Sequence, residues 1–144
     1  MKVSIKNISD NPLPAYATAG ASGVDLRAFI PAAITLQPLE RILVPTGLFL
    51  EIPEGWEAQV RPRSGLAIKQ GLTCLNTPGT IDCDYRGEIK VILVNLGQEA
   101  QTIQTGDRVA QMVFQQVQQV QWQLSTELQA SERGDGGFGH TGHQ

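Results

Sequence analysis

The sequence is poor in several features that would assign it to a special class of protein. Its 144 residues contain only two cysteines, Cys74 and Cys83, which form neither a CxxC pair nor a disulfide framework. No apolar run reaches the roughly 18 residues of a membrane-spanning helix, and residues 1–14 lack the apolar region and cleavage site of a secretory signal. We therefore expect a cytoplasmic protein of a reducing compartment, with no membrane partner.

An excess of charge of one sign is also missing. The formal net charge is −3, so the chain lacks the basic composition typical of proteins that coat nucleic acids, and we expect no nucleic-acid partner. Four of the seven arginines nevertheless lie in or beside glycine-containing segments, at positions 63, 86, 108 and 133. Such clustering is compatible with a local cationic pocket for a small anion on an acidic protein.

Glycine and proline are abundant, and they divide the chain into short segments. The 15 glycines and 8 prolines recur every few residues, which favours many strands over long helices. WEAQVR (56–61) alternates apolar and polar residues, and EIKVILVN (88–95) is apolar on nearly both faces, as in a central strand. RILVPTGLFLEI (41–52) predicts two strand pieces broken at Pro45. The length suits one domain, and the pattern predicts an all-β sandwich, jelly roll or barrel.

One short segment has the pattern of a helix. In SGLAIKQG (64–71), Ser64 can cap the N-terminus and Gly71 can end the helix. At its start, Arg63, Ser64 and Gly65 offer a guanidinium, a hydroxyl and an unobstructed N–H, which together can bind an anion. From these residues alone, an anion site and an ordinary capped helix are equally good interpretations.

Two polar side chains are predicted to lie in apolar surroundings. Asp25 lies inside ASGVDLRA (21–28), where a carboxylate costs free energy unless it is paired, hydrated beside a metal or hydrogen-bonded; the simplest interpretation is a salt bridge with Arg27 or another arginine. Gln111, in GDRVAQM (106–112), would face the apolar side of a regular strand, so its amide needs a partner. That partner can be a ligand or a backbone group.

The stretch GTIDCDYRGE (79–88) concentrates charge between a Pro-Gly turn and a strongly apolar run. If it is extended, Asp82 and Asp84 point the same way, whereas a turn would break the alternation. Two carboxylates on one face can bind a metal or divide acid and base roles between them. A solvated turn is the third interpretation, and the residues alone leave all three open.

The last segment, SERGDGGFGHTGHQ (131–144), differs from the rest of the chain. Its five glycines leave too little side chain for a core and too much backbone entropy for a stable element. GDGGFG (134–139) matches GxGxxG, but the strand, helix and acidic residue that a dinucleotide site needs are not expected around it. From this segment alone, two interpretations stay open: a disordered tail, or a tail that becomes ordered on a ligand or on another subunit, where Arg133 would meet anionic groups and Phe138 would stack on a flat ring.

Five segments resemble, in order, the five motifs of the trimeric deoxyuridine triphosphatase (dUTPase) family. They are AGASGVDLRA (19–28), RPRSGLAIKQG (61–71), LNTPGTIDCDYRGEIKV (75–91), GDRVAQMVF (106–114) and RGDGGFGHTG (133–142). The resemblance runs from near the N-terminus almost to the last residue, and five ordered motifs are far more specific than any one alone. It favours a functional role for Asp25, the turn at Ser64, Gln111 and the tail.

The resemblance implies an all-β subunit, a jelly roll or distorted β-barrel with one short helix. It implies a homotrimer with three active sites, each built from residues of all three chains. Residues 1–130 would form the jelly-roll domain, and residues 131–144 a flexible arm that closes the active site of a neighbouring subunit. The implied reaction is the hydrolysis of dUTP to dUMP and pyrophosphate.

The resemblance also assigns roles to individual residues. Asp82 is similar to the aspartate that holds and activates the attacking water, and Asp25 to the aspartate near the ribose and the metal's water shell. Tyr85 resembles the tyrosine that packs under the deoxyribose and leaves no room for a ribose hydroxyl, whereas Asp84 has no such counterpart. The implied substrate contacts are Arg63, Ser64, Gly65, Asn76, Gly79, Ile81, Tyr85, Lys90, Gln111, Arg133, Phe138, Gly139 and Thr141.

The implied cofactor is Mg²⁺, held by the triphosphate and by waters with no direct protein ligand. Such a site agrees with the lack of a dense carboxylate cluster in the sequence. One residue departs from the family pattern, because His140 stands where serine is usual.

Two other functions share part of this pattern. A dCTP deaminase relative has the same fold, but it needs a glutamate placed as the deamination base, and the third motif with its tyrosine fits dUTPase better. A non-catalytic trimer that binds nucleotide would be expected to lack Asp82, Tyr85 or the tail, and all three are present.

Overall fold

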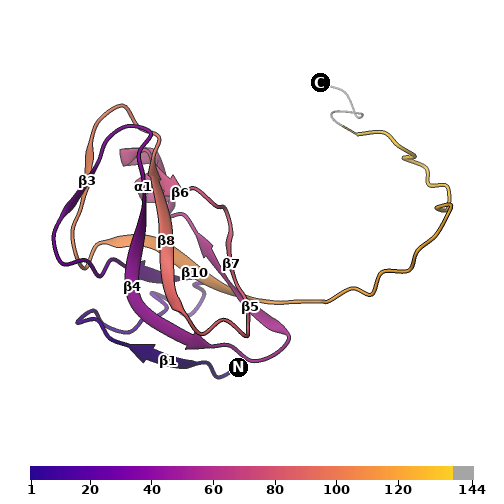
Figure 1. Ribbon diagram of the computed structural model, residues 1–144, viewed down its shortest axis with the longest axis horizontal. Helices are drawn as coiled ribbons and strands as arrows, with labels where there is room; N and C mark the ends of the chain where they lie inside the picture. Colours follow the sequence, from indigo (N-terminus) through magenta and orange to yellow (C-terminus); the bar gives the residue numbers. More distant parts are fainter. Residues whose placement is uncertain (138–144) are drawn as a thin grey trace.

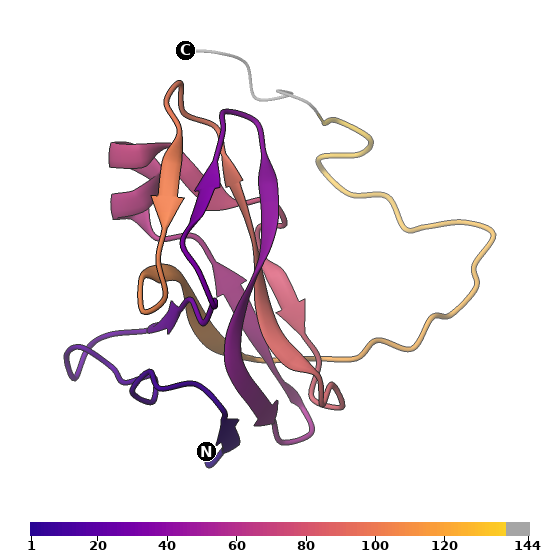
Figure 2. The same ribbon diagram turned by 60° about the vertical axis from the view of Figure 1, so that its left-hand side comes forward.

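The computed structural model describes residues 1–137, which form short antiparallel strands and one helix (Figure 1). Two four-stranded sheets have the orders β1-β4-β8-β6 and β2-β10-β5-β7, and a two-stranded ribbon pairs β3 with β9. The long strands β4 and β8 run side by side, as Figure 2 shows. The elements are β1 (Ser4–Asn7), β2 (Val24–Arg27), β3 (Ile34–Leu36), β4 (Arg41–Glu51), β5 (Trp56–Arg61), α1 (Ser64–Gln70), β6 (Leu72–Cys74), β7 (Gly79–Ile81), β8 (Glu88–Asn95), β9 (Gln101–Ile103) and β10 (Arg108–Gln116).

Residues of both four-stranded sheets form one buried apolar cluster, and strand alternation decides which side chains enter it. On β8, Ile89, Val91 and Leu93 are buried, whereas Lys90 is exposed and Ile92 half-buried between them. This strand lies between β4 and β6, as its sequence predicted. The segment 56–61 is also confirmed as a strand, with its alternate apolar residues in the core.

The predicted break at Pro45 is wrong, because residues 41–51 form a single strand, β4. Proline cannot donate a ladder hydrogen bond, and the regular pairing with β8 is interrupted between Pro45 and Phe49. Within this bulge Gly47 has a φ of +72°, a conformation that glycine adopts without strain. Its N–H donates to Glu88 Oε1 at 2.8 Å, so a side chain of β8 replaces the missing backbone partner.

Helix α1 differs from the prediction at its start and agrees with it at its end. The N-cap is Arg63, which has extended backbone angles and makes no side-chain capping hydrogen bond, so the expectation that Ser64 caps the helix is wrong by one residue. Gly71 ends the helix with a φ of 68°, as predicted. No residue of α1 is buried, so the helix lies on the surface of the sheets.

The two cysteines are both free thiols. Cys74 is buried in the core, and this burial raises the pKa of its thiol to about 11. It is therefore inert as a nucleophile near neutral pH. Cys83 is half-buried in the turn after β7 and packs against the same core.

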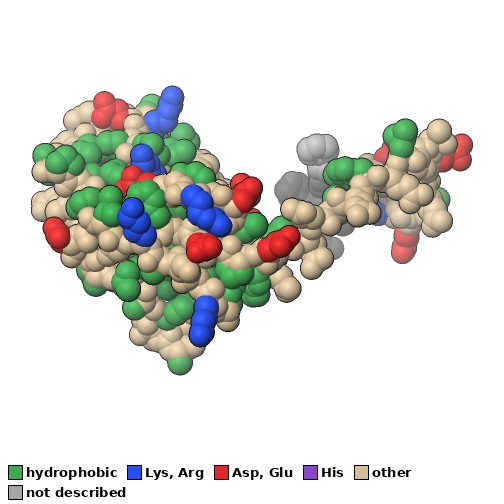
Figure 3. Space-filling view, turned by 60° about the horizontal axis from the view of Figure 1, so that its bottom comes forward, with side chains coloured by type: hydrophobic (Ala, Val, Ile, Leu, Met, Phe, Trp, Pro, Cys, Tyr) green, Lys and Arg blue, Asp and Glu red, His purple; other side chains and the backbone are tan. Residues whose placement is uncertain are grey.

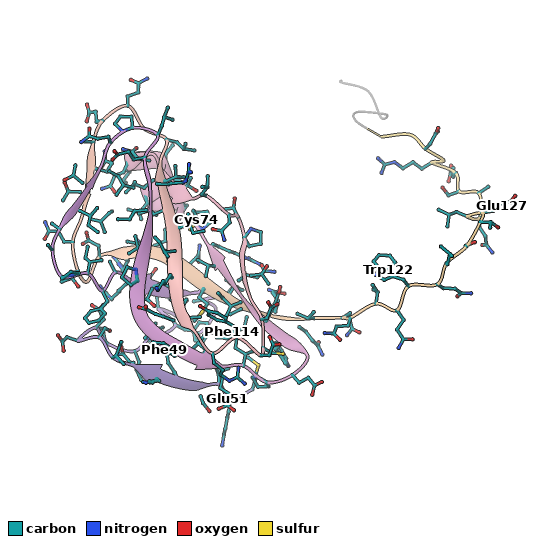
Figure 4. The ribbon with its side chains drawn as sticks, viewed as in Figure 1. Phe49, Glu51, Cys74, Phe114, Trp122 and Glu127 are labelled. Carbon is teal, nitrogen blue, oxygen red and sulfur yellow. The ribbon has the colours of Figure 1, made fainter. Side chains whose placement is uncertain are left out.

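Beyond β10, residues 117–137 contain neither a helix nor a strand and leave the sheets as an extended arm (Figure 1). Figure 3 shows this arm separate from the compact body, and Figure 4 places Trp122 and Glu127 on it, far from Phe49 and Phe114. Trp122, Leu124 and Leu128 are at least 91% exposed. No helix in the described part is long and apolar enough to cross a membrane.

Candidate active site

The charged stretch after β7 is a tight turn. β7 ends at Ile81, and the Tyr85 N–H then donates to the Asp82 carbonyl at 3.1 Å, which closes a four-residue turn. Arg86 Nη1 donates to the Cys83 carbonyl at 2.6 Å and braces the turn from outside. The extended alternation that would place Asp82 and Asp84 on one face is therefore broken.

A pocket of about 430 Å³ beside this turn gathers five of the predicted site residues. They come from β7 and its turn, from β8, and from the loop after β6. A further predicted residue, Gly79, supports the pocket: a Cβ on it would lie 3.0 Å from Asn76 Nδ2, so glycine lets that amide pack closely. Asp84 lines only a neighbouring hollow, together with Arg86, and Asp82 borders both. The pocket is lined by Leu43, Asn76, Thr80, Ile81, Asp82, Tyr85, Glu88, Lys90 and Ile92.

A second group of predicted residues lies around Asp25 on β2. Its carboxylate accepts from Arg63 Nε at 2.8 Å and from Arg108 Nη1 at 3.3 Å, and Arg63 also donates to the Arg108 carbonyl. The suggested partner Arg27 instead donates to the Gly106 carbonyl. Asp25 thus sets the positions of two guanidinium groups, each with further donors free to meet an anion.

Gln111 completes this group from the neighbouring strand. A register shift between Arg108 and Ala110 interrupts the regular alternation of β10, and Gln111 then pairs with Asp25 across the strands. Its Nε2 donates to the Pro62 carbonyl at 3.0 Å, so the partner that its position requires is a backbone group. Ser64 and Gly65 are exposed at the start of α1, next to Arg63. Arg108 lies inside the fourth motif, but it was not among the site residues predicted from the sequence.

The pocket and the Asp25 group lie apart in a single chain. The sheet order is β2-β10-β5-β7, so Asp25 and the turn after β7 are at opposite edges. Three strand spacings of about 4.8 Å separate these edges by roughly 14 Å. In one chain the predicted residues therefore form two separate groups.

Comparison with known proteins decides the family. The dUTPase family model matches residues 9–142. The chain belongs to the dUTPase family. It is 57% identical over 143 residues to the deoxyuridine 5'-triphosphate nucleotidohydrolase of Finegoldia magna, covering 99% of this chain and 100% of that protein. It is 61% identical over 140 residues to the protein of the same name from Cytophaga hutchinsonii, covering 97% of this chain and 91% of that one.

Solved dUTPase structures confirm the all-β jelly-roll fold. A mutant dUTPase of Staphylococcus bacteriophage 80alpha with dUpNHpp superposes with a TM-score of 0.88 at 22% identity, over 99% of both chains. A mutant dUTPase from phage phi11 of S. aureus superposes with a TM-score of 0.80 at 19% identity, over 90% of this chain and 100% of that one. That second structure is described as showing the coordination of a structural Mg(II) ion.

Of the predicted substrate contacts in the tail, the structure describes only Arg133. Arg133 is exposed on the arm, and its Nε donates to the Gly136 carbonyl at 2.7 Å. Phe138, Gly139 and Thr141, like His140, lie outside the described residues.

The carboxylates of the candidate site stand singly in the part of the chain that the structure describes. Within residues 1–137 no three His, Cys, Asp or Glu side chains are grouped as metal ligands. The Asp25 carboxylate is paired with two arginines, and Asp82 is exposed in its turn. Single carboxylates of this kind can meet the water shell of a hydrated Mg²⁺ ion.

Gly87 is required by the position of the Tyr85 ring. The tyrosine folds back over it, and the Tyr85 hydroxyl donates to the Glu88 carbonyl at 3.1 Å. A Cβ at position 87 would meet the Tyr85 hydroxyl oxygen and ring carbons well inside van der Waals contact. A rigid aromatic ring can relieve this overlap only by moving as a whole.

Gly87→Ala is therefore expected to displace Tyr85 and to weaken discrimination against a ribose hydroxyl. We expect the ratio of kcat/KM for dUTP to that for UTP to fall by about tenfold or more. Steady-state pyrophosphate release with both nucleotides measures this ratio. Gly20→Ala is the matched control, since a Cβ there would meet nothing within 4 Å. An unchanged ratio would show that the tyrosine does not exclude the hydroxyl.

Proposed function

We propose that this protein hydrolyses dUTP to dUMP and pyrophosphate, by attack of a water on the α-phosphorus. The observation that carries this proposal is the pocket in which Asp82, Tyr85 and Asn76 meet. A carboxylate, an aromatic ring and an amide there match the needs of a water, a deoxyribose and a uracil edge. Relatives named for this activity, 57% and 61% identical over nearly the whole chain, support it.

Asp82 acts on the attacking water in this mechanism. Its exposed carboxylate stands at the start of the turn and reaches the pocket from the edge of the sheet. A carboxylate is a weak base, so much of its effect comes from orienting the water in line with the α-phosphorus. Asp84, which borders another hollow, takes no part.

Recognition of the nucleoside is divided between Tyr85 and Asn76. Tyr85 is held by Gly87 and by the Glu88 carbonyl, and it packs under the deoxyribose. Asn76 donates and accepts hydrogen bonds at the uracil edge, with Gly79, Ile81 and Lys90 completing the contact. Each hydrogen bond left unmade by a wrong base costs about 1–3 kcal/mol, which makes such a pocket selective.

The remaining predicted contacts reach the substrate through a homotrimer. Asp25 and Arg63 lie at the sheet edge opposite the pocket, so we propose that a neighbouring subunit supplies them, with Ser64, Gly65 and Gln111, to the triphosphate. In the proposed division, residues 1–130 belong to the jelly-roll domain of each subunit, with residues 117–130 extending beyond its last strand, β10. Residues 131–144 form the arm, which brings Arg133 and Phe138 to the site of another chain. The exposed apolar side chains of residues 120–128 favour such a contact between chains.

Mg²⁺ would be bound by the triphosphate oxygens and waters, with Asp25 near its water shell. When bound, the ion neutralises phosphate charge and restrains the conformation of the triphosphate. Arg63 and Arg108 supply fixed positive charge beside it. We further propose that the protein acts in the cytoplasm, with no nucleic-acid or membrane partner.

The contacts of the Glu88 carboxylate disfavour a deaminase function. Glu88 is the one glutamate that lines the described pocket. Its carboxylate is occupied, because Oε1 accepts from the Gly47 N–H at 2.8 Å and Oε2 lies 3.6 Å from Lys90 Nζ. A deamination base would need a carboxylate free to exchange protons with the substrate.

A product assay tests the proposed function. We expect purified protein with magnesium to release pyrophosphate from dUTP at least about 10²-fold faster than from dCTP, dTTP or UTP. Ammonia release from dCTP would instead indicate the deaminase. Binding of dUTP without any product would indicate a nucleotide-binding trimer and would contradict the proposal.

A further inference from the structure

Two apolar side chains line the nucleotide pocket without a role in the mechanism above. Leu43 of β4 and Ile92 of β8 are direct partners across the two strands. Both lie on the outer face of this sheet, where Leu43 keeps 52% of its surface exposed and Ile92 is half-buried. The same face of β8 carries Lys90 and Glu88, so the pair is an apolar patch inside a polar pocket.

The position of this pair along β8 places it away from the reacting end of the pocket. Glu88, Lys90 and Ile92 alternate on one face, and at about 3.3 Å per residue Ile92 lies roughly 13 Å beyond Glu88. The Glu88 carbonyl accepts a hydrogen bond from the hydroxyl of Tyr85, and Tyr85 is the residue proposed to pack under the deoxyribose. Lys90 and then Ile92 therefore follow in the direction away from the turn that carries Asp82.

The residue proposed to read uracil lies at that same end. The Leu75 N–H donates to the Ile92 carbonyl at 2.9 Å, and Asn76 follows directly. This backbone bond extends the pairing of β6 with β8 by one step and ties Asn76 to Ile92. The amide that can take the polar edge of a base and the two apolar side chains thus share one end of the pocket.

We propose that Leu43 and Ile92 form the apolar wall against which the pyrimidine base packs, and that they contribute to base specificity. This inference rests on the proposed function. Small-molecule pockets are lined mainly by apolar side chains, with a few polar groups that set orientation. A flat ring resting on the pair covers the exposed surface of Leu43, while Asn76 takes its polar edge. Glu88, the nearest carboxylate on this face, is occupied by Gly47 and Lys90.

Polar substitutions of similar size test the wall. In Leu43→Asn and Ile92→Thr, we expect the affinity for dUMP, measured by calorimetry with magnesium, to fall by about tenfold. Affinity for inorganic tripolyphosphate should stay at the parental value, because that ligand has no base. We expect kcat/KM for dUTP to fall in parallel with dUMP affinity, with kcat nearly unchanged. Ile92→Val should retain parental affinity, since it remains apolar.

Ile68→Thr is the matched control, since Ile68 is 83% exposed on α1 and does not line the pocket. The proposal is overturned if both polar variants bind dUMP like the parent, or if they lose tripolyphosphate affinity equally. A change of oligomeric state by light scattering, with dUMP affinity retained, would assign the patch to a subunit contact instead. A parent that binds dUMP but releases no pyrophosphate from dUTP refutes the proposed function and still leaves the wall to be judged by dUMP affinity.

Discussion

Asp82→Asn is expected to bind dUMP with nearly parental affinity and to hydrolyse dUTP about 10³-fold more slowly, within the range that a positioned base contributes. Asparagine keeps the size of the side chain and the exposed position in the turn, so the pocket formed with Asn76 and Tyr85 should persist. What it lacks is the negative charge that holds and polarises the attacking water. The loss should therefore appear in kcat and not in binding.

Asp84→Asn is the control for this experiment, because the two aspartates occupy the same turn. Asp84 is exposed and lines the hollow that contains Arg86, which Asp82 also borders, but it does not line the pocket of Asn76 and Tyr85. We expect it to retain parental turnover, measured as pyrophosphate release with magnesium. Equal loss in both variants would revive the hypothesis that the carboxylates act as a pair, and full activity in Asp82→Asn would refute the mechanism.

Truncation after residue 130 is expected to leave the domain folded and to reduce dUTP turnover by at least about 10²-fold. Residues 131–137 are exposed or nearly so, and their recorded hydrogen bonds are local, such as that from Arg133 to Gly136. Removing residues 131–137 therefore takes no described contact from the core. The truncation does remove the guanidinium and the aromatic ring that are proposed to close the site of a neighbouring chain.

Two single variants test whether the positive charge of Arg133, and not the length of the arm, is what turnover requires. Arg133→Ala should reproduce much of the loss, whereas Glu132→Ala, its exposed neighbour, should behave like the parent. Thermal unfolding and light scattering report whether the truncated chain keeps its stability and oligomeric state. A truncated protein that turns over dUTP at the parental rate would remove the arm from the mechanism.

Local sequence pattern was sufficient for the strands that obey strict alternation. β5 lies where alternation predicted it and β8 where a run apolar on nearly both faces predicted a central strand. Gly71 ends α1 because its positive φ suits glycine. Pro45 shows where local reasoning failed. A proline without an N–H predicted a break, but β4 stays continuous through a bulge in which the Gly47 N–H donates to the Glu88 carboxylate, 41 residues further along the chain. Such a contact has no local trace in the sequence.

The partners of the polar site residues were likewise decided by tertiary structure. The sequence indicated that Asp25 and Gln111 need partners, since burial of an unpaired polar group costs free energy. It did not specify that Asp25 pairs with Arg63 and Arg108, or that Gln111 donates to the Pro62 carbonyl. These contacts join residues far apart in the chain, and they exist because β2, β10 and β5 are adjacent.

The order of five short motifs by itself determined the family, the all-β class and the identity of most candidate site residues. It could do so because the type and spacing of side chains are properties of the sequence. Which of those residues share a pocket was decided by tertiary structure. The packing of the two sheets brings Asn76, Asp82 and Tyr85 together from the segments after β6 and β7, and strand order leaves Asp25 at the far edge of its sheet. Long-range pairing of strands creates this division, and no local pattern encodes it.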